Sequence, residues 1–353
     1  MLSKVIIYQH QQQIYTFAYR DELLNFVVVE DLDTLPTESI LRGKITKLNH
    51  ANRTAFIEYG TGQYGYINLP TWLKVQEGSN LIAQLSWHGN HEKQAKLRYG
   101  WQLIGKHLIY AGSANETKIN GKNLSSQMSS KLLTLLAKFP AIWSVRSRVN
   151  MATDEDAILS EAHELYSQAK LIESNTNSGV LASGLPAYMK LLRSLPLVSD
   201  GEVITNLQTA YELVAKLQDS WLLDVISYKP NLDYNSAIKN YQDLLTQSQV
   251  MVTGGAMLDI HTVAGINIID VNTGTLNLSG SKVNFIVLDE IYRQICLRNL
   301  QGIILIDVIK NMHQSDEQRI VSYLQKLFSI DISKAKVLGF SHSGLLEIIR
   351  NKV

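Results

Sequence analysis

The chain has 353 residues, more than one hydrophobic core usually supports, so the sequence predicts several lobes. Its 33 Lys and Arg residues nearly balance 32 Asp and Glu residues, so a polyanion would have to bind a local basic patch. Hydrophobic residues make up 45% of the chain, as in ordinary globular proteins, and no stretch of about 18 apolar residues occurs that would span a membrane. The N-terminus lacks a secretory signal, and the single cysteine, Cys296, excludes an internal disulfide and a cysteine-rich zinc site. These features predict a cytoplasmic protein.

The first hundred residues read as β-structure. Residues 1–36 contain strand patterns of mixed polarity and end at Pro36. From Ile40 to about Arg98 the segments ILRGKITKL, TAFIEYG, YGYINL and NLIAQLSW are rich in β-branched and aromatic residues. Turns with Gly, Asn and His separate them. This pattern is typical of a small barrel or sandwich.

The middle of the chain changes to helical patterns. The polar stretch GSANETKINGKNLSSQ predicts an exposed loop or hairpin. Helices are expected over Ser130–Phe139, Asp154–Ile172 and about 200–222; the second begins with two acidic residues, which favour a helix N-terminus. The segment SNTNSGVLASGLP (174–186) predicts a linker.

The last hundred residues alternate strands and helices. Strands are expected over 257–260, 266–271, 303–309 and 336–340, and helices over 282–300, from Ser315, and from Gly344 to the end. The run Ile303–Ile309 is almost continuously apolar, which predicts a strand with both sheet faces covered. Ser315 with Gln318 predicts a capping box. The alternation indicates an α/β layer.

Two acidic residues interrupt apolar strands of this layer. Asp270 lies in INIIDVN and Asp307 lies in IILIDVI, each toward the C-terminal end of its strand. An unpaired carboxylate buried among Ile and Val is costly, so each needs a partner. One interpretation is structural: each aspartate pairs with Lys or Arg, or caps the following loop. The other is that one helical crossover brings the strands together and the two carboxylates share a cation.

Neighbouring strands lie about 4.8 Å apart, which lets two such carboxylates close on one ion. Because no histidine cluster stands beside them, oxygen ligands favour Mg²⁺ or Mn²⁺ over Zn²⁺. Asn272 follows Asp270 by two residues and therefore faces the same side of a strand. It is expected to support the metal site. A cation held this way suits phosphoryl chemistry.

The same residues carry a family resemblance. GINIIDVNTG followed by NFIVLDEIYRQICLRNLQGIILIDVIKNM, and later SGLLE, resembles the catalytic region of the ribonuclease E/G family over about 95 residues. In that family the two aspartates bind one Mg²⁺, which implies this role for Asp270 and Asp307 as catalytic metal ligands. The family asparagine matches Asn272.

The resemblance extends to the β-rich segment. LRGKITKLNHANRTAFIEYGTGQYGYINL is similar to the family's OB-fold RNA-binding domain. Its base-stacking aromatic positions correspond to Phe56 and Tyr66, and a basic position corresponds to Lys93. Stacking gives about 1–3 kcal/mol per base without demanding a particular sequence. The alternative is that Phe56 and Tyr66 fill the barrel interior.

A third region resembles the family's pocket for an RNA 5′-monophosphate. SVRSRV is similar to its arginine–threonine clamp, with Arg146 and Ser147 at the two positions. Gly105 and Ile109 align with backbone positions of that pocket. Arginine offers a bidentate fork and serine a hydroxyl group, both suited to phosphate. Arg146 as an ordinary surface ion pair remains the alternative.

The sequence also departs from the family pattern. The family's CPxCxGxG zinc link and its small following domain are absent from the 353 residues, so no zinc and no zinc-linked dimer is expected. Ile286 replaces a Glu of the catalytic helix, Cys296 replaces an Arg, and an Arg is lost near His342. These changes keep the aspartate pair but predict weakened cleavage or an altered choice of substrate.

The expected fold is therefore an α/β and β mosaic. The resemblance implies an RNase H-like lobe (1–36 and 186–245), an OB-fold (37–100), a 5′-phosphate sensor-like lobe (101–185) and a DNase I-like α/β catalytic lobe (246–353). The expected activity is Mg²⁺-dependent endonucleolytic hydrolysis of single-stranded RNA. A catalytically weakened RNA-binding relative and a metal-dependent phosphodiesterase with another substrate are the alternatives. The oligomeric state stays open.

Overall fold

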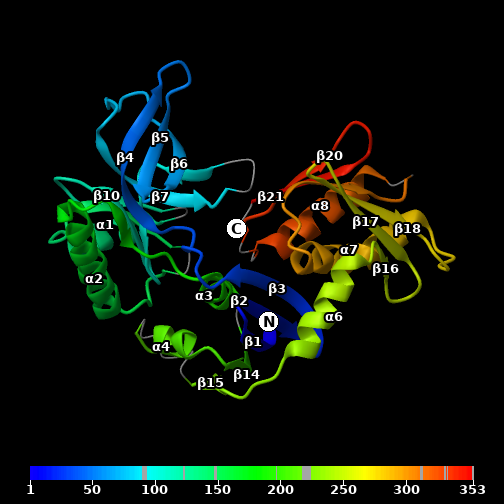
Figure 1. The fold of residues 1–353 in the computed structure, drawn as a ribbon. Helices are drawn as coiled ribbons and strands as arrows, with labels where there is room; N and C mark the ends of the chain where they lie inside the picture. Colours follow the sequence, from blue (N-terminus) through cyan, green and yellow to red (C-terminus); the bar gives the residue numbers. More distant parts are fainter. Residues whose placement is uncertain are drawn as a thin grey trace. The chain divides into compact units, whose positions relative to one another are not determined.

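The computed structural model describes residues 1–89, 94–121, 124–146, 149–195, 197–216, 224–310, 313–329, 331 and 333–351. They divide into two compact units. The barrel unit is Leu35–Leu185, and the two-sheet unit is Met1–Thr34 together with Pro186–Val353. The chain thus begins in the two-sheet unit, leaves it to build the barrel unit, and then returns (Figure 1).

Five strands of the barrel unit close into a barrel. Their order is β4-β5-β6-β8-β7, and β7 pairs back to β4. Alternate side chains point inward, and Ile45, Ile57 and Ile67 are fully buried there. The closed barrel agrees with the predicted OB-fold. The strands are β4 (Ile40–Asn49), β5 (Thr54–Gly60), β6 (Gln63–Asn68), β7 (Asn80–Trp87) and β8 (Ala95–Arg98).

A short strand extends this sheet where a linker is predicted. β13 (Gly179–Ala182) pairs antiparallel with β4, with Val180 opposite Leu41. The Ser- and Gly-rich composition of 174–186 predicts a linker, yet four of its residues are in the sheet. Hydrogen bonding between strands uses backbone groups and not side chains, so a segment of small residues can form the edge strand of a sheet.

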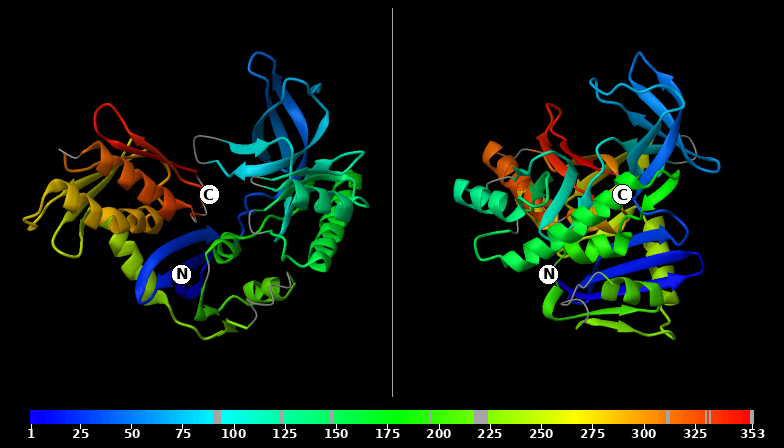
Figure 2. Two further views of the ribbon diagram at one scale, coloured as in Figure 1. Left: turned by 180° about the vertical axis from the view of Figure 1, so that it is seen from behind. Right: turned by 90° about the vertical axis from the view of Figure 1, so that its left-hand side faces the viewer.

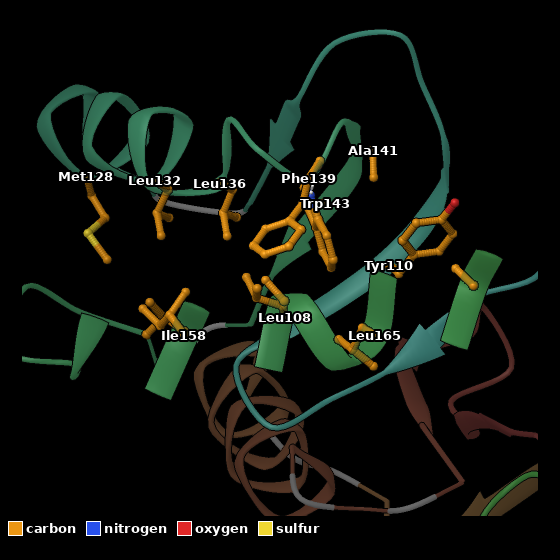
Figure 3. Packing of buried hydrophobic residues seen from close by; sticks show 13 residues of the cluster. Leu108, Tyr110, Met128, Leu132, Leu136, Phe139, Ala141, Trp143, Ile158 and Leu165 are labelled. Carbon is orange, nitrogen blue, oxygen red and sulfur yellow. Dashed lines mark hydrogen bonds between the residues drawn. The ribbon is translucent and has the colours of Figure 1, made fainter. Parts of the chain in front are cut away.

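The rest of the barrel unit is a four-stranded sheet with two helices. The sheet order is β11-β12-β10-β9. Figure 3 shows apolar side chains of both helices and of the sheet meeting in one cluster, with Trp143 and Tyr110 fully buried. Asp154 caps α2 through the amide of Asp156, as the acidic start of that helix predicts. The elements are β9 (Leu103–Ile104), β10 (Leu108–Ser113), β11 (Lys118–Asn120), α1 (Ser126–Leu136), β12 (Ala141–Val145) and α2 (Glu155–Ser174).

The first sheet of the two-sheet unit joins distant parts of the chain. Its order is β15-β14-β1-β2-β3, antiparallel across β1, β2 and β3 and parallel from β1 to β15. Residues near 197–205 form a strand, although a helix is predicted from about residue 200. The elements are β1 (Leu2–His10), β2 (Gln13–Arg20), β3 (Leu23–Asp31), α3 (Ala187–Ser194), β14 (Leu197–Thr205), α4 (Gln208–Lys216), β15 (Ile226–Tyr228) and α6 (Asn235–Thr246).

The second sheet of this unit has the order β16-β17-β18-β19-β21-β20, and α6 connects the two sheets (Figures 1 and 2). Helix α7 packs against the first sheet as well, where Tyr292 meets the ring of Phe26. The elements are β16 (Gln249–Met251), β17 (Met257–Val263), β18 (Ile266–Asn272), α7 (Gly280–Leu297), β19 (Gly302–Asp307), α8 (Gln314–Phe328), β20 (Lys336–Phe340) and β21 (Leu346–Arg350).

Burial alternates along the strands of this second sheet. On β19, Ile304 and Ile306 are fully buried, whereas Ile303 is 46% exposed. The prediction that both faces of this strand are covered is therefore wrong, because apolar composition does not by itself reveal which face is packed. We call the uncovered side the open face.

Two further predictions for this region are wrong. The terminal segment forms β21 and not a helix, since its side chains alternate between buried and accessible as it pairs with β19 and β20. Helix α8 begins after His313, and no side chain caps it, so the capping box predicted at Ser315 is not formed. The amides of Asp316 and Glu317 bond to the His313 carbonyl instead.

Candidate active site and nucleic-acid interface

The two predicted aspartates lie side by side. Strands β18 and β19 are parallel neighbours, and their register pairs Asp270 directly with Asp307. Residues paired across neighbouring strands point to the same face, here the open face. Both carboxylates are half-buried. Among the described residues neither forms an ion pair with Lys or Arg, and the amide of Asn272 donates to Asp270 Oδ2 over 2.9 Å.

A buried asparagine fixes the register that brings the aspartates together. Asn267, only 4% exposed, donates to the carbonyls of Gln301 and Ile303 and accepts from Thr262 Oγ1. It thereby ties β18 to both of its neighbours. Because a slip of one residue would turn every side chain to the other face, this tie helps to keep both aspartates on the open face.

The turn after β18 depends on glycine. Gly274 has a φ of 56°, and a Cβ there would lie 2.0 Å from the carbonyl oxygen of Gly255. The amide of Thr275 donates to that same oxygen. Only glycine allows this close approach, so the sequence Asn272–Gly274 packs tightly against the turn before β17.

The loop after β19 is held by helix α7. The side chain of Asn284, fully buried, donates to the Ile309 carbonyl over 2.8 Å and accepts from the Ile309 amide over 3.0 Å. Gly280 permits the approach, because a Cβ there would lie 2.5 Å from Ile309 Cγ2. Both the amide and the carbonyl of Ile309, two residues beyond Asp307, are thus held by Asn284.

The donor set fits a hard divalent cation. Two carboxylates and an amide oxygen are the ligand types that Mg²⁺ accepts, and Mg²⁺ completes its octahedral shell with water or substrate phosphate. In the described part of the chain no three His, Cys, Asp or Glu side chains gather as a metal-binding group. Asp270, Asp307 and Asn272 are the residues that could hold such a cation.

Two further polar residues of the open face are not among those predicted from the sequence. Asp259 of β17 is paired in register with Asp270, so three aspartates lie in a row across three strands. His261, two residues later, faces the same side, and its Nε2 lies 2.9 Å from Asp259 Oδ1. The alternation of polar and apolar residues in MLDIHTV is the signal that identifies them once that segment is taken as a strand.

The barrel carries an aromatic pair on its outer surface. Phe56 and Tyr66 are directly opposite each other on β5 and β6, and both are partly exposed. Their neighbours along the strands, Ala55, Ile57 and Ile67, fill the interior. The alternative that Phe56 and Tyr66 fill the barrel is therefore wrong.

Lysines flank this aromatic pair. Lys47 of β4 pairs with Phe56, and Lys96 of β8 pairs with Tyr66, so the row reads Lys47, Phe56, Tyr66, Lys96. Both lysines are exposed. They are not among the sequence predictions, since the pairing that aligns them is tertiary. The predicted Lys93 lies outside the described residues. Aromatic faces beside cations are the elements of a single-strand binding surface.

The loop predicted to bind a 5′-phosphate is held together from inside the unit. The Gly105 amide donates to the Leu108 carbonyl, and Arg146 Nη1 donates to the Gly105 carbonyl over 2.9 Å. Ile109 lies in β10, between β9 and β12. Ser147 lies outside the described residues.

A carboxylate from helix α2 occupies the other donors of this loop. Glu161 accepts from the amides of His107 and Leu108 and from His107 Nδ1. A Cβ at Gly105 would lie 1.9 Å from Glu161 Oε1, so the glycine leaves the room that this carboxylate occupies. Glu161 and His107 are each 14% exposed in their side chains.

The three departures from the family pattern occupy different environments. Ile286 is 41% exposed on α7, His342 lies in the exposed turn between β20 and β21, and Cys296 is buried. Burial raises the pKa of the Cys296 thiol to about 12. It is therefore an inert thiol at neutral pH.

The fold defines a mixed α/β protein that contains a closed five-stranded barrel. Residues 102–353, most of the chain, match the family described as the Ribonuclease E/G family. The chain belongs to the ribonuclease E/G family.

Individual relatives are distant but cover most of the chain. It is 23% identical over 351 residues to a Ribonuclease E/G-like protein of Porphyra purpurea, covering 89% of this chain and 68% of the relative. It is 20% identical over 354 residues to Ribonuclease G of Escherichia coli (strain K12), covering 89% and 72%. It is 20% identical over 396 residues to Ribonuclease E of a Synechocystis strain, covering 99% and 57%.

Proposed function

We propose that this protein is a Mg²⁺-dependent endoribonuclease that cleaves single-stranded RNA in RNA processing or decay. The observation that carries the proposal is the in-register pair of Asp270 and Asp307 on the open face. Relatives named Ribonuclease G and Ribonuclease E support RNA as the substrate.

Asp270 and Asp307 would hold the cation, and Asn272 would orient Asp270 through its amide. Mg²⁺ or Mn²⁺ bound there would supply a Lewis acid for the phosphate and an activated water. Products would be a 3′-hydroxyl and a 5′-phosphate. Phe56 and Tyr66 would stack on bases, and Lys47 and Lys96 would contact the backbone.

The finer fold assignments belong to the same proposal. The order β15-β14-β1-β2-β3 supports an RNase H-like lobe, and the mixed sheet β16–β21 with α7 and α8 supports a DNase I-like lobe. Of the described residues, no helix is long and apolar enough to cross a membrane. We also propose a cytoplasmic location; the free, buried thiol of Cys296 agrees with a reducing compartment.

The test compares cleavage of a fluorescent single-stranded RNA by wild type, Asp270→Asn and Asp307→Asn. Each substitution keeps the shape of the side chain but removes a charge, so we expect a loss of at least about 100-fold. Mn²⁺ binding, followed by electron paramagnetic resonance, should weaken in parallel.

Asp243→Asn is the matched control, because Asp243 is exposed on α6 of the same unit. It should cleave RNA and bind Mn²⁺ as wild type does. Wild-type protein that binds the RNA and leaves it intact would support the non-catalytic relative instead. Faster cleavage of a DNA oligonucleotide of the same sequence would support the alternative substrate.

A further inference from the structure

A histidine–aspartate pair stands on the open face beside the aspartate pair. His261 and Asp259 are two residues apart on β17, so both side chains point to the same side. His261 Nε2 lies 2.9 Å from Asp259 Oδ1 in an ion-pair contact, and this buried oxygen has no hydrogen-bond partner among the described residues. The Asp259 side chain is 28% exposed and the His261 side chain 55% exposed. One nitrogen of the imidazole thus lies against the carboxylate, and the ring is accessible to a ligand.

Register brings this pair next to the candidate metal ligands. Asp259 is directly opposite Asp270, which is in turn opposite Asp307. Directly opposite residues of an antiparallel pair have Cβ atoms about 5 Å apart. Because its ring reaches back to Asp259, the His261 imidazole lies toward the aspartate row.

Asp259 has a role different from that of its neighbours in the row. Its ion-pair partner is His261. A carboxylate that lies against one imidazole nitrogen favours one position of the ring and leaves the other nitrogen available for proton transfer.

The charged groups of the open face around His261 come from three other strands. Its cross-strand partner is Ile268, which pairs with Leu305, and Leu305 pairs with Glu347 of β21. Asp270 and Asp307 complete the set. No lysine or arginine of β17, β18 or β19 lies on this face, so His261 is the one proton donor that these three strands present there.

We propose that His261, positioned by Asp259, donates a proton to the departing 3′ oxygen when the phosphodiester is hydrolysed. This inference rests on the proposed function. A water oxygen forms the new bond to phosphorus, and the bond from phosphorus to O3′ breaks. O3′ takes the imidazolium proton and becomes the 3′-hydroxyl. The proton lost by the water passes to solvent, and the imidazole regains one from solvent, so one water is consumed overall.

If the pair of His261 and Asp259 were purely structural, its loss would have a different effect on the cleavage rate. Exposed pairs of this kind contribute about 0–1 kcal/mol, so breaking one would barely change stability or cleavage. A leaving-group proton donor contributes about 10²–10⁴-fold to the rate. A sulfur atom in place of O3′ separates the two roles, since a thiol is far more acidic than an alcohol and a thiolate departs without a proton.

The experiment uses one RNA whose cleavage site has been mapped with wild-type protein, made with either oxygen or sulfur at the 3′ bridging position. His261→Gln should cleave the oxygen RNA at least about 100-fold more slowly than wild type, and the sulfur RNA within about threefold of wild type. Asp259→Asn should lose less on the oxygen RNA and be rescued in the same way. Both variants should bind Mn²⁺ as wild type does.

His163→Gln serves as the control, because His163 is exposed on α2 of the barrel unit. Equal losses on both RNAs for His261→Gln, or no loss on the oxygen RNA, would overturn the proposal. Asp270→Asn should fail on both RNAs, which distinguishes a lost metal ligand from a lost proton donor. Wild-type protein that cleaves neither RNA would remove the proposed function and this inference together; wild-type cleavage without sulfur rescue would remove only the inference.

Discussion

The side chain of Asn284 forms two hydrogen bonds with the backbone of Ile309, one in each direction. Ile309 lies two residues beyond Asp307, and Asn284 is fully buried within helix α7. A helix on the covered side of the sheet therefore fixes the position of a carboxylate on its open face.

Replacing Asn284 with leucine should destabilise the protein and slow cleavage. The Ile309 amide and carbonyl would lose their buried partners, which costs about 1–3 kcal/mol. A displacement of about 1 Å in the Asp307 loop would lower the cleavage rate up to about 100-fold. Urea unfolding and RNA cleavage would measure the two effects. Asn177→Leu, an exposed position of the barrel unit, should change neither; full activity in Asn284→Leu would contradict the role of this contact.

Loss of either barrel aromatic should weaken RNA binding. Phe56→Ala and Tyr66→Ala should each lower affinity for a single-stranded RNA by about 1–3 kcal/mol, because one base loses its stacking partner. Fluorescence anisotropy at several salt concentrations is the measurement.

Lys47→Gln should instead reduce the slope of log affinity against log salt by about 0.7, because one contact with the RNA backbone is lost. Tyr228→Ala, on β15, should leave both quantities unchanged. Unaltered affinity in Phe56→Ala would remove the barrel face from the RNA interface.

Folding stability should depend on the protonation of Glu30. Burial raises the pKa of its carboxyl above the ordinary value of 4.5, although amides of Ala187 and Tyr188 at the start of α3 partly oppose this. A raised folded-state pKa contributes stability that is present below the unfolded pKa and lost as pH rises through the folded one. The stability of wild type relative to Glu30→Gln should therefore fall as pH rises from about 4.5 and then level off. Urea unfolding across this range measures it. Glu22→Gln, at an exposed position, should show no such trend, and a rising relative stability would refute the assignment.

The state of the RNA 5′ end should matter little to this protein. Glu161 occupies the amides of His107 and Leu108, and the Gly105 amide is bonded within the loop. A phosphate would have to compete with a carboxylate already in place. Rates on 5′-monophosphorylated and 5′-hydroxyl forms of one RNA should then agree within about threefold. A large preference for the monophosphate that disappears in Arg146→Gln would show that the loop rearranges to bind it.

Several features could be read from the sequence because each depends on local patterns. Alternating β-branched residues predicted the barrel strands, and the acidic start at Asp154 predicted the cap of α2. The predicted terminal helix and the predicted capping box at the start of α8 were wrong. The sequence GLLEIIR is compatible with either a helix or a strand, and its partner strands decide between them. Strand β21 is selected by β19 and β20, which it joins.

The sequence by itself determined the residue types available for the chemistry: two aspartates, each at the end of an apolar strand, and an asparagine two residues after the first. Only the tertiary structure decided that Asp270 and Asp307 are in register, that Asp259 and His261 share their face, and that lysines flank the barrel aromatics. The physical reason is that pairing between strands is a choice among many distant partners. Buried contacts such as those of Asn267 make that choice, and they have no signature in the order of the residues.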